Sequence, residues 1–421
     1  MTAPRQDKAA VYMGASDLQV PGIEAARAAG LWTIVTDRSP TAAGRSHADQ
    51  FEVVDATDVA ALLRLAEREN VKRRIVGAYG VADYAFRAVG AIAERFALSI
   101  GTPAQFAAMA DKAEARARMH AAGVRVPEQL TCEGRDHVAA TAATAIRTLP
   151  FPVVVKPTDS FNSRGVTVVA TPSQARLTQA LQAALAAGTR AVIETEIQGT
   201  HYNVDGLFCG GAFHPVAITE RLFVDEVGRQ ALSGFEPNDI GAETRAALWS
   251  CAEHAARALD QRNGPMTADI VMATDGPVVL EVSPHFHCLA ANALRGGSAI
   301  RAWFEYLAGA ADWQRHLRGD AEVVVGYHYV RSFADGRIFD GMAGHDIALG
   351  SGIARQIIPA KALGDTIHAS KSSGDMIAVA LVRSTGRSEF LSNCKAIEST
   401  LDVRYRAEPR GRLSSANEVR P

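Results

Sequence analysis

The segment MTADIVMATDGPVVLEVSPHFH occupies residues 266–287 and carries two acids in an otherwise apolar setting. β-Branched and apolar residues lie on both sides of Thr274-Asp275-Gly276-Pro277, a run of turn-forming residues. This pattern predicts a β-hairpin. A turn centred on Asp275 would place Asp269 directly opposite Glu281.

Strand alternation then puts both acids on one face of the hairpin, together with Val271, Ala273, Val279 and Ser283. Directly opposed side chains have Cβ atoms about 4.5–5.5 Å apart, so two like charges repel each other there. A hard cation such as Mg²⁺ would offset this repulsion, because it prefers oxygen ligands and keeps waters or phosphates as further ligands. The alternative is a solvent-facing strand edge with two unrelated acids.

The composition is that of a cytoplasmic, multidomain globular protein. A chain of 421 residues is too long for one ordinary core, so two to four domains are expected. A net charge of −2 gives no attraction to nucleic acid or to an anionic membrane. No apolar run approaches the length of a membrane span, and the N-terminus lacks the apolar core of a signal peptide. The five cysteines are scattered without a CxxC pair, which favours reduced thiols.

Residues 9–110 alternate between short apolar strands and helices, which predicts a small parallel sheet of Rossmann-like type. Gly14 ends the first strand, but the second and third glycines of a GxGxxG fingerprint are absent. The second glycine lets the backbone approach a pyrophosphate, so NAD binding is not expected. This sheet is predicted to be a scaffold, with Asp17 or Tyr79 at a strand end near a substrate.

Two lysines occupy positions that indicate a role beyond solubility. Asp111 is placed to cap a helix, and Lys112 lies in the first turn, where its charge opposes the helix dipole. Lys156 ends the apolar strand 152–156 and is followed by the polar loop 158–165. Such a loop suits phosphates, although it is not a Walker A loop. The alternatives are an exposed lysine and an ordinary hairpin with a hydrophilic tip.

Further segments complete the predicted order of elements. TRAVIETEI, residues 189–197, is a buried strand with acids at its exit, and a hairpin follows at 207–219. An amphipathic helix at 243–259 leads into the hairpin of residues 266–287. Strands at 322–331, 353–358 and 376–382, with a helix at 389–400, predict a last α+β region.

Four of these segments, in this order and spacing, resemble the ATP-grasp superfamily: DKAEARARMHAAGVRVP, VVVKPTDSFNSRGV, VIETEIQGTHYNVDG and GPMTADIVMATDGPVVLEVSP. The resemblance covers nearly the whole chain and is closest to carboxylate–amine ligases related to carbamoyl-phosphate synthetase, biotin carboxylase and the L-amino acid ligases. It implies a mixed α/β and α+β fold: a preATP-grasp domain at 1–110, an ATP-grasp domain at 111–319 and a C-terminal subdomain with a polar tail at 320–421. Residues 125–196 would form a small mobile subdomain.

The resemblance also implies roles for individual residues. ATP would be bound by Lys112, Lys156, Ser163, Gly165, Glu194, Glu196, Ile197 and His201. The metal ligands would be Asp269, Glu281 and Ser283, with Mg²⁺ as the ion. The opposed acids of the hairpin and the family's metal ligands are thus the same pair.

This chain departs from the family after Glu281. The family continues Glu-x-Asn-Pro-Arg, whereas Ser283 and His285 replace the asparagine and arginine here. Ser283 is a weaker ligand than a carboxamide, so one or two Mg²⁺ ions are expected. His285 would steady phosphate charge only when protonated, and Arg295 or Arg164 would be its substitutes. The run His285-x-His287-Cys288 also offers a zinc alternative, but it lacks a second ligand pair.

The expected function is therefore an ATP-dependent, ADP-forming ligase that activates a carboxylate as an acyl phosphate and couples it to an amine. Its partners would be small molecules, and since dimers are common among similar proteins, a homodimer is an open expectation. Two alternatives remain: carboxylation or phosphoryl transfer through carboxyphosphate, and a catalytically reduced ATP-binding protein. The sequence does not identify the acid or the amine.

Overall fold

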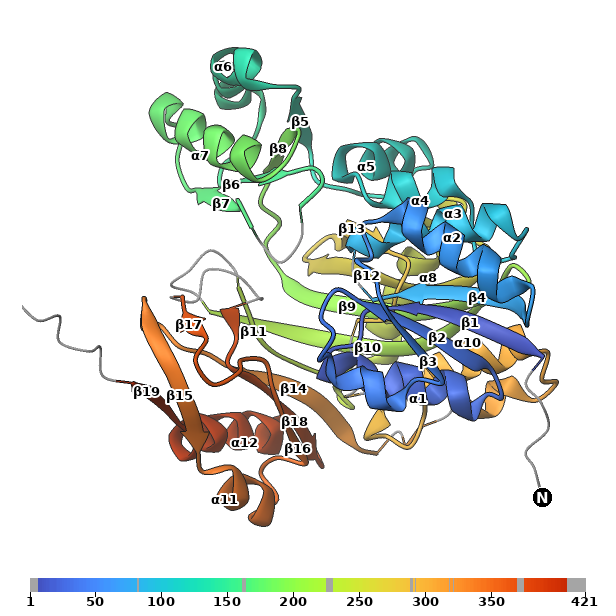
Figure 1. The fold of residues 1–421 in the computed structure, drawn as a ribbon. Helices are drawn as coiled ribbons and strands as arrows, with labels where there is room; N and C mark the ends of the chain where they lie inside the picture. Colours follow the sequence, from blue (N-terminus) through green and yellow to red (C-terminus); the bar gives the residue numbers. More distant parts are fainter. Residues whose placement is uncertain are drawn as a thin grey trace, which may run out of the picture.

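The computed structural model describes residues 7–81, 83–160, 164–224, 230–287, 291, 293–317, 319–320, 322–368 and 375–406. Within these ranges the strands form four sheets, and the helices cover them in a mixed α/β arrangement (Figure 1). This confirms the predicted fold class. None of the helices in these ranges is both long and apolar enough to cross a membrane.

The N-terminal sheet is parallel throughout, with strand order β3-β2-β1-β4. Its strands are β1 (Lys8–Met13), β2 (Trp32–Asp37), β3 (Gln50–Val53) and β4 (Arg74–Gly80). The helices between and after them are α1 (Val20–Ala28), α2 (Val59–Asn70) and α3 (Phe86–Arg95). Asp58 caps α2 by accepting a hydrogen bond from the Ala61 N–H. The αβ alternation expected for residues 9–110 is therefore confirmed.

The central sheet is antiparallel and has eight strands in the order β13-β12-β9-β10-β11-β14-β18-β16. These are β9 (Thr200–Cys209), β10 (Ala212–Val224), β11 (Gln230–Phe235), β12 (Gly264–Ala273), β13 (Gly276–Ser283), β14 (Val324–Val330), β16 (Gln356–Pro359) and β18 (Ala378–Ser384). Helix α8 (Ala242–Ala258) packs on β12 and β13, and α12 (Arg387–Thr400) packs on β18 and β14. Because β11 pairs with β14, the C-terminal strands β14, β18 and β16 extend the same sheet.

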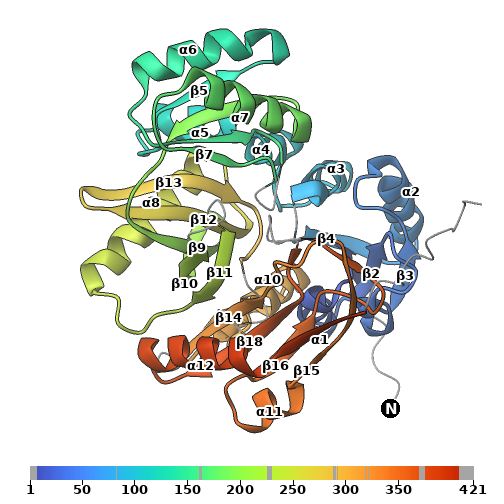
Figure 2. The ribbon, with the colours of Figure 1, turned by 90° about the vertical axis from the view of Figure 1, so that its left-hand side faces the viewer.

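A smaller antiparallel sheet, β5-β8-β6-β7, stands apart at the top of Figures 1 and 2. It consists of β5 (Gln129–Cys132), β6 (Val153–Pro157), β7 (Thr167–Val169) and β8 (Ala191–Thr195). Helices α6 (Val138–Thr148) and α7 (Gln174–Ala187) cover it and bury a hydrophobic core of its own. The chain reaches this unit after α5 (Lys112–Ala121) and leaves it into β9. Its mobility and the domain boundaries stay predictions.

The remaining elements flank these sheets. A third antiparallel sheet contains β15 (Arg337–Ala343), β17 (Thr366–Ile367) and β19 (Asp402–Arg406), with α11 (His345–Gly350) following β15. Helix α4 (Pro103–Met109) precedes α5, and α10 (Ala299–Ala308) contacts α1 and β4. The N-terminal sheet is thereby joined to the central one through a continuous core.

The β12–β13 hairpin has the predicted pair of acids but not a uniform register. Asp269 pairs with Glu281, as expected. Toward the turn, however, Ile270 pairs with Val279, so Leu280 is the extra residue of a β-bulge. The bulge turns Val279 into the core beneath α8, and the predicted placement of Val279 beside the two acids is wrong.

Candidate active site

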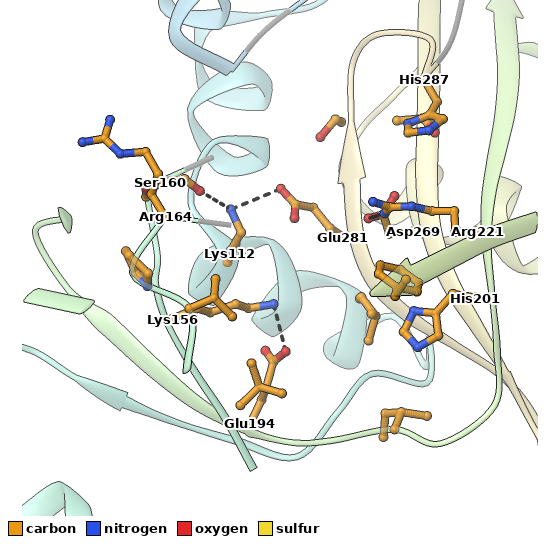
Figure 3. A pocket seen from close by; sticks show the side chains of 18 of the residues that line it. Lys112, Lys156, Ser160, Arg164, Glu194, His201, Arg221, Asp269, Glu281 and His287 are labelled. Carbon is orange, nitrogen blue, oxygen red and sulfur yellow. Dashed lines mark hydrogen bonds and ion pairs between the residues drawn. The ribbon is translucent and has the colours of Figure 1, made fainter. Parts of the chain in front are cut away.

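A cleft of about 400 Å³ opens between the small sheet, α5 and the central sheet (Figure 3). Most of the residues singled out from the sequence line it: Lys112, Lys156, Arg164, Glu194, Glu196, Ile197, His201, Asp269, Glu281, Ser283 and His285. From the N-terminal domain, Val81 and Tyr84 reach the cleft, whereas the expected Asp17 and Tyr79 do not line it. The cleft thus collects side chains from segments far apart in the sequence.

Lys112 is fixed at the start of α5 by its neighbour. The Asp111 carboxylate caps the helix by accepting from the N–H groups of Ala113 and Glu114. The Lys112 ammonium then turns into the cleft, where it donates to the Ser160 carbonyl at 2.9 Å and lies 3.3 Å from Glu281 Oε1. Its unfavourable position in the helix dipole is therefore offset by a carboxylate partner.

Lys156 and Glu194 form a buried pair on neighbouring strands of the small sheet. Their Nζ and Oε1 atoms are 2.8 Å apart, and the Arg116 guanidinium bonds the other oxygen of Glu194. Burial tends to raise the pKa of Glu194, but Arg116 and Lys156 outweigh it and hold this pKa at about 2. Burial lowers the pKa of Lys156, with Arg116 adding to the effect. Glu194 thus holds the position of Lys156.

Arg116 was missed by sequence reasoning. Besides Glu194, it donates to the Leu280 carbonyl from Nε at 3.1 Å and from Nη2 at 2.8 Å. It thereby ties α5 to the bulge of the β12–β13 hairpin. The available signal was spacing, since Arg116 lies four residues after Lys112 and on the same helix face.

Asp269 has partners for both of its oxygens. Oδ1 accepts from the Asn203 amide, and Oδ2 lies 3.0 Å from Arg221 Nη1. Burial raises the pKa of Asp269 and Glu281 raises it further, although Arg221 opposes both. The pKa of Glu281 is lowered instead, because Lys112 and Lys156 outweigh its burial. No pattern in the sequence indicated that Asn203 and Arg221 reach this carboxylate.

The donor set suits Mg²⁺. Asp269, Glu281 and Ser283 line the cleft from adjacent strands and offer two carboxylates and a hydroxyl. In the described ranges no group of three or more His, Cys, Asp or Glu side chains is placed to hold a metal ion. An ion on the two carboxylates would therefore complete its shell with hydroxyl, water or phosphate oxygens, as Mg²⁺ does. The zinc alternative gains no support, and its Cys288 lies outside the described residues.

The remaining predicted residues are dispersed. Arg295 does not line the cleft, because its guanidinium bonds Glu236 and the Asp320 carbonyl. Gly165, with φ +73°, packs against Pro157 and Ala187 rather than lining the cleft. Ser163 lies outside the described residues.

Two histidines follow the hairpin. His285 lines the cleft, and its Nδ1 is 2.8 Å from the Phe286 carbonyl oxygen. His287 is 2.8 Å from the Tyr327 hydroxyl through Nε2. Burial, with Arg221 adding to it, lowers the pKa of His287 well below its usual value, so this ring is neutral near pH 7.

Comparison with known proteins agrees with this geometry. The model of the ATP-grasp domain family matches residues 109–288. The vancomycin B-type resistance protein VanB of Enterococcus faecalis is 32% identical over 236 residues, which are 52% of this chain and 66% of that protein. A formate-dependent phosphoribosylglycinamide formyltransferase of Burkholderia thailandensis is 26% identical over 287 residues, covering 66% of this chain and 69% of that protein. The chain thus spans about two thirds of the length of each relative.

Solved structures show the same fold over nearly the full chain. An L-amino acid ligase from Bacillus licheniformis superposes with a TM-score of 0.78 at 16% identity, covering 96% of this chain and all of that one (100%). An N5-carboxyaminoimidazole ribonucleotide synthetase from Thermotoga maritima gives 0.72 at 14% identity, covering 94% and 99%. The chain belongs to the ATP-grasp superfamily. Membership of this superfamily identifies it as an ATP-binding protein.

Proposed function

We propose that the protein is an ATP-dependent carbon–nitrogen ligase that forms ADP. A substrate carboxylate oxygen attacks the γ-phosphorus of ATP, ADP leaves, and an acyl phosphate results. An amine nitrogen then attacks the acyl carbon, phosphate leaves, and the nitrogen loses a proton to give an amide. Catalysis of this kind depends on positioning and on charge neutralisation.

The observation that carries this proposal is the meeting of two lysines with two opposed carboxylates in one cleft. Lys112 lies 3.3 Å from Glu281. Lys156 lines the same cleft and is held there by its ion pair with Glu194. Lys112 and Lys156 would bind the nucleotide phosphates as point charges. Asp269, Glu281 and Ser283 would hold Mg²⁺, which when bound neutralises charge on the phosphate oxygens.

The nucleoside would lie at the other end of the cleft, beside the exit of β8. Glu196, Ile197 and His201 line that end and would contact the adenine and ribose. The backbone there is held in place, because the Glu196 N–H donates to the Pro152 carbonyl at 2.9 Å. Glu194 would act through Lys156, as a positioning residue rather than a contact to adenine.

A second candidate is carboxyphosphate chemistry with bicarbonate as the acid. A structure of the same fold, the biotin carboxylase domain of a Hydrogenobacter thermophilus carboxylase, is described in complex with MgADP and bicarbonate. That structure is 14% identical to this chain, so it supports the fold alone. The two candidates share the nucleotide site and differ in the acid.

A hydroxylamine trap tests the proposal. The protein would be incubated with Mg·ATP, hydroxylamine and pooled carboxylic acids, and hydroxamate and ADP would be measured. Hydroxamate from one acid, formed together with ADP, is the expected result and identifies the acid. ADP that depends on bicarbonate without hydroxamate would favour the second candidate. ATP binding with no turnover across a broad panel of acids would contradict both.

A further inference from the structure

Arg221 is a cleft residue for which the proposed function has no role. It lies on β10, and its side chain is 18% exposed. Its guanidinium carbon is 5.0 Å from the centre of the Phe223 ring, and His201 packs edge-on against that ring at 4.9 Å. Figure 3 shows Arg221 beside Asp269, on the opposite side of Glu281 from Lys112 and Lys156. Its position is therefore fixed by packing, and it faces the part of the cleft beyond the two lysines.

The charge of Arg221 is balanced by Asp269, whose Oδ2 is 3.0 Å from Nη1. An arginine stays protonated at any working pH, so it needs an anion wherever it lies. The other oxygen of Asp269 already accepts from Asn203. A metal ion that binds Asp269 would compete with Arg221 for the carboxylate, because both are cations. A guanidinium displaced from one carboxylate pairs most strongly with another carboxylate or with a phosphate.

The other acids that line the described cleft have cations of their own or lie at the nucleoside end. Glu281 pairs with Lys112, and Glu194 pairs with Lys156. Glu196 borders the nucleoside end. The anion best placed for Arg221 is therefore one that arrives with the reactants.

We propose that Arg221 is an oxyanion-binding residue, held ready by the metal-binding carboxylate Asp269. When a metal ion binds Asp269, the Arg221 guanidinium turns to an oxyanion in the part of the cleft beyond the two lysines. That oxyanion is either the phosphoryl group being transferred or the carboxylate that attacks it. The inference rests on the proposed function, since it assumes that Mg·ATP occupies this cleft.

The other candidate cations are less well placed. Arg295 is engaged outside the cleft by Glu236 and Asp320. Arg164 lies beside Ser160, on the far side of the lysines in Figure 3. His285 has its Nδ1 2.8 Å from the Phe286 carbonyl oxygen, so this ring atom is already engaged. Arg221 is permanently charged and adjacent to a metal-binding carboxylate.

Calorimetry on Arg221→Gln tests the proposal with two probes, Mg·ADP and the Mg complex of β,γ-imido-ATP, which retains a γ-phosphate. If Arg221 binds the phosphoryl group, the affinity for the imido analogue falls on the order of tenfold or more, while the affinity for ADP stays within about twofold. If it binds the acid, both nucleotide affinities hold, and the KM for the acid found by the hydroxylamine trap rises by about tenfold or more. Either result supports the proposal. Equal losses for both nucleotides, or no change in affinity and in KM, would overturn it.

Two further measurements separate this inference from a structural role and from the proposed function. Arg331→Gln is the matched control, because Arg331 directly follows β14 of the same sheet and lies over the Tyr329 ring at 5.6 Å, but does not line the cleft. It should leave the affinity ratio of the two nucleotides unchanged.

Mn²⁺ titrated by electron paramagnetic resonance without nucleotide should bind Arg221→Gln more tightly than wild type, because a competing cation is gone. If wild type binds no Mg·nucleotide, the proposed function itself fails; if it binds and Arg221→Gln behaves as wild type, this inference alone fails.

Discussion

Asp269 and Glu281 face each other across the β12–β13 ladder, and each is bound by a cation from a different element, Arg221 of β10 and Lys112 of α5. Two opposed carboxylates whose side chains are only 31% and 25% exposed would repel each other without these partners. The two cations neutralise the pair and connect the hairpin to the rest of the cleft. A change to any member of this arrangement should therefore affect ligand binding before it affects the fold.

Lys112→Met should weaken nucleotide binding by about tenfold or more, because the substitution removes a phosphate ligand. It should also raise the pKa of Glu281, since Lys112 is the leading charge that lowers it against the effect of burial. Fluorescence titration with a nucleotide analogue measures the affinity. Arg118→Met on the exposed side of α5, where Arg118 pairs with Glu114, is the control and should bind normally. Equal nucleotide affinities for the two variants would show that Lys112 does not bind the nucleotide.

Arg116→Met should be among the most destabilising single substitutions in the chain. It leaves Glu194 buried with one cation fewer and removes both donors to the Leu280 carbonyl. Breaking a buried pair in this way costs about 3–5 kcal/mol of unfolding free energy. Urea denaturation measures the loss, and the double variant Arg116→Met with Glu194→Gln should recover part of it. A double variant no more stable than the single one would argue against charge as the cause.

Asp205 should make the protein less stable as the pH rises. Burial raises the pKa of its carboxyl from 3.8 to about 7, although Thr267 and the His287 N–H oppose the shift. Between these two values the folded state binds more protons than the unfolded state, so the free energy of unfolding falls as the pH increases through that window. The loss is complete above about pH 7 and amounts to at most roughly 4 kcal/mol.

Asp205→Asn should abolish this dependence and be more stable than wild type at pH 8. The amide oxygen can still accept from the His287 N–H, which donates to Asp205 Oδ1 at 3.0 Å. Thermal melts at pH 5 and pH 8 give the comparison. A wild-type protein that shows no more loss of stability over this range than the variant would mean that Asp205 is ionised in the fold.

Gly199→Ala should disturb the junction between β8 and β9. Gly199 has φ +151°, and a Cβ there would lie 2.2 Å from the Met272 carbonyl oxygen, a backbone atom that cannot move aside cheaply. Gly211→Ala is the control, because Gly211 has φ +81° but open space around its Cβ position. The control should cost about 1 kcal/mol from backbone strain alone, and Gly199→Ala clearly more. Similar melting temperatures for the two variants would show that the clash is relieved.

The main features of the cleft could be predicted from the sequence, while its supporting contacts could not. The pairing of Asp269 with Glu281 follows from turn residues and strand alternation, which are local signals. The bulge at Leu280 was missed, because nothing in an apolar run marks where one extra residue is inserted. Arg221 pairs with a residue 48 positions away, and this contact exists only once β9 lies between β10 and β12.

Arg295 illustrates the opposite error. It was a candidate to substitute for the arginine that the family has where this chain has His285, but the sequence does not determine the direction of a side chain. Its guanidinium is bound by Glu236, 59 residues earlier in the chain. Tertiary partners of this kind are set by the sheet order, which no local pattern encodes.

Calorimetric titration of Mg·ATP into wild type and Glu281→Gln tests whether the paired acids hold the metal ion. Glutamine keeps the size and an oxygen of the side chain but removes the charge that would hold the metal. The account predicts that the affinity falls by about tenfold or more, while circular dichroism and the melting temperature show an intact fold. Unchanged binding of Mg·ATP by a folded Glu281→Gln protein would contradict the assignment of the paired acids as the metal site.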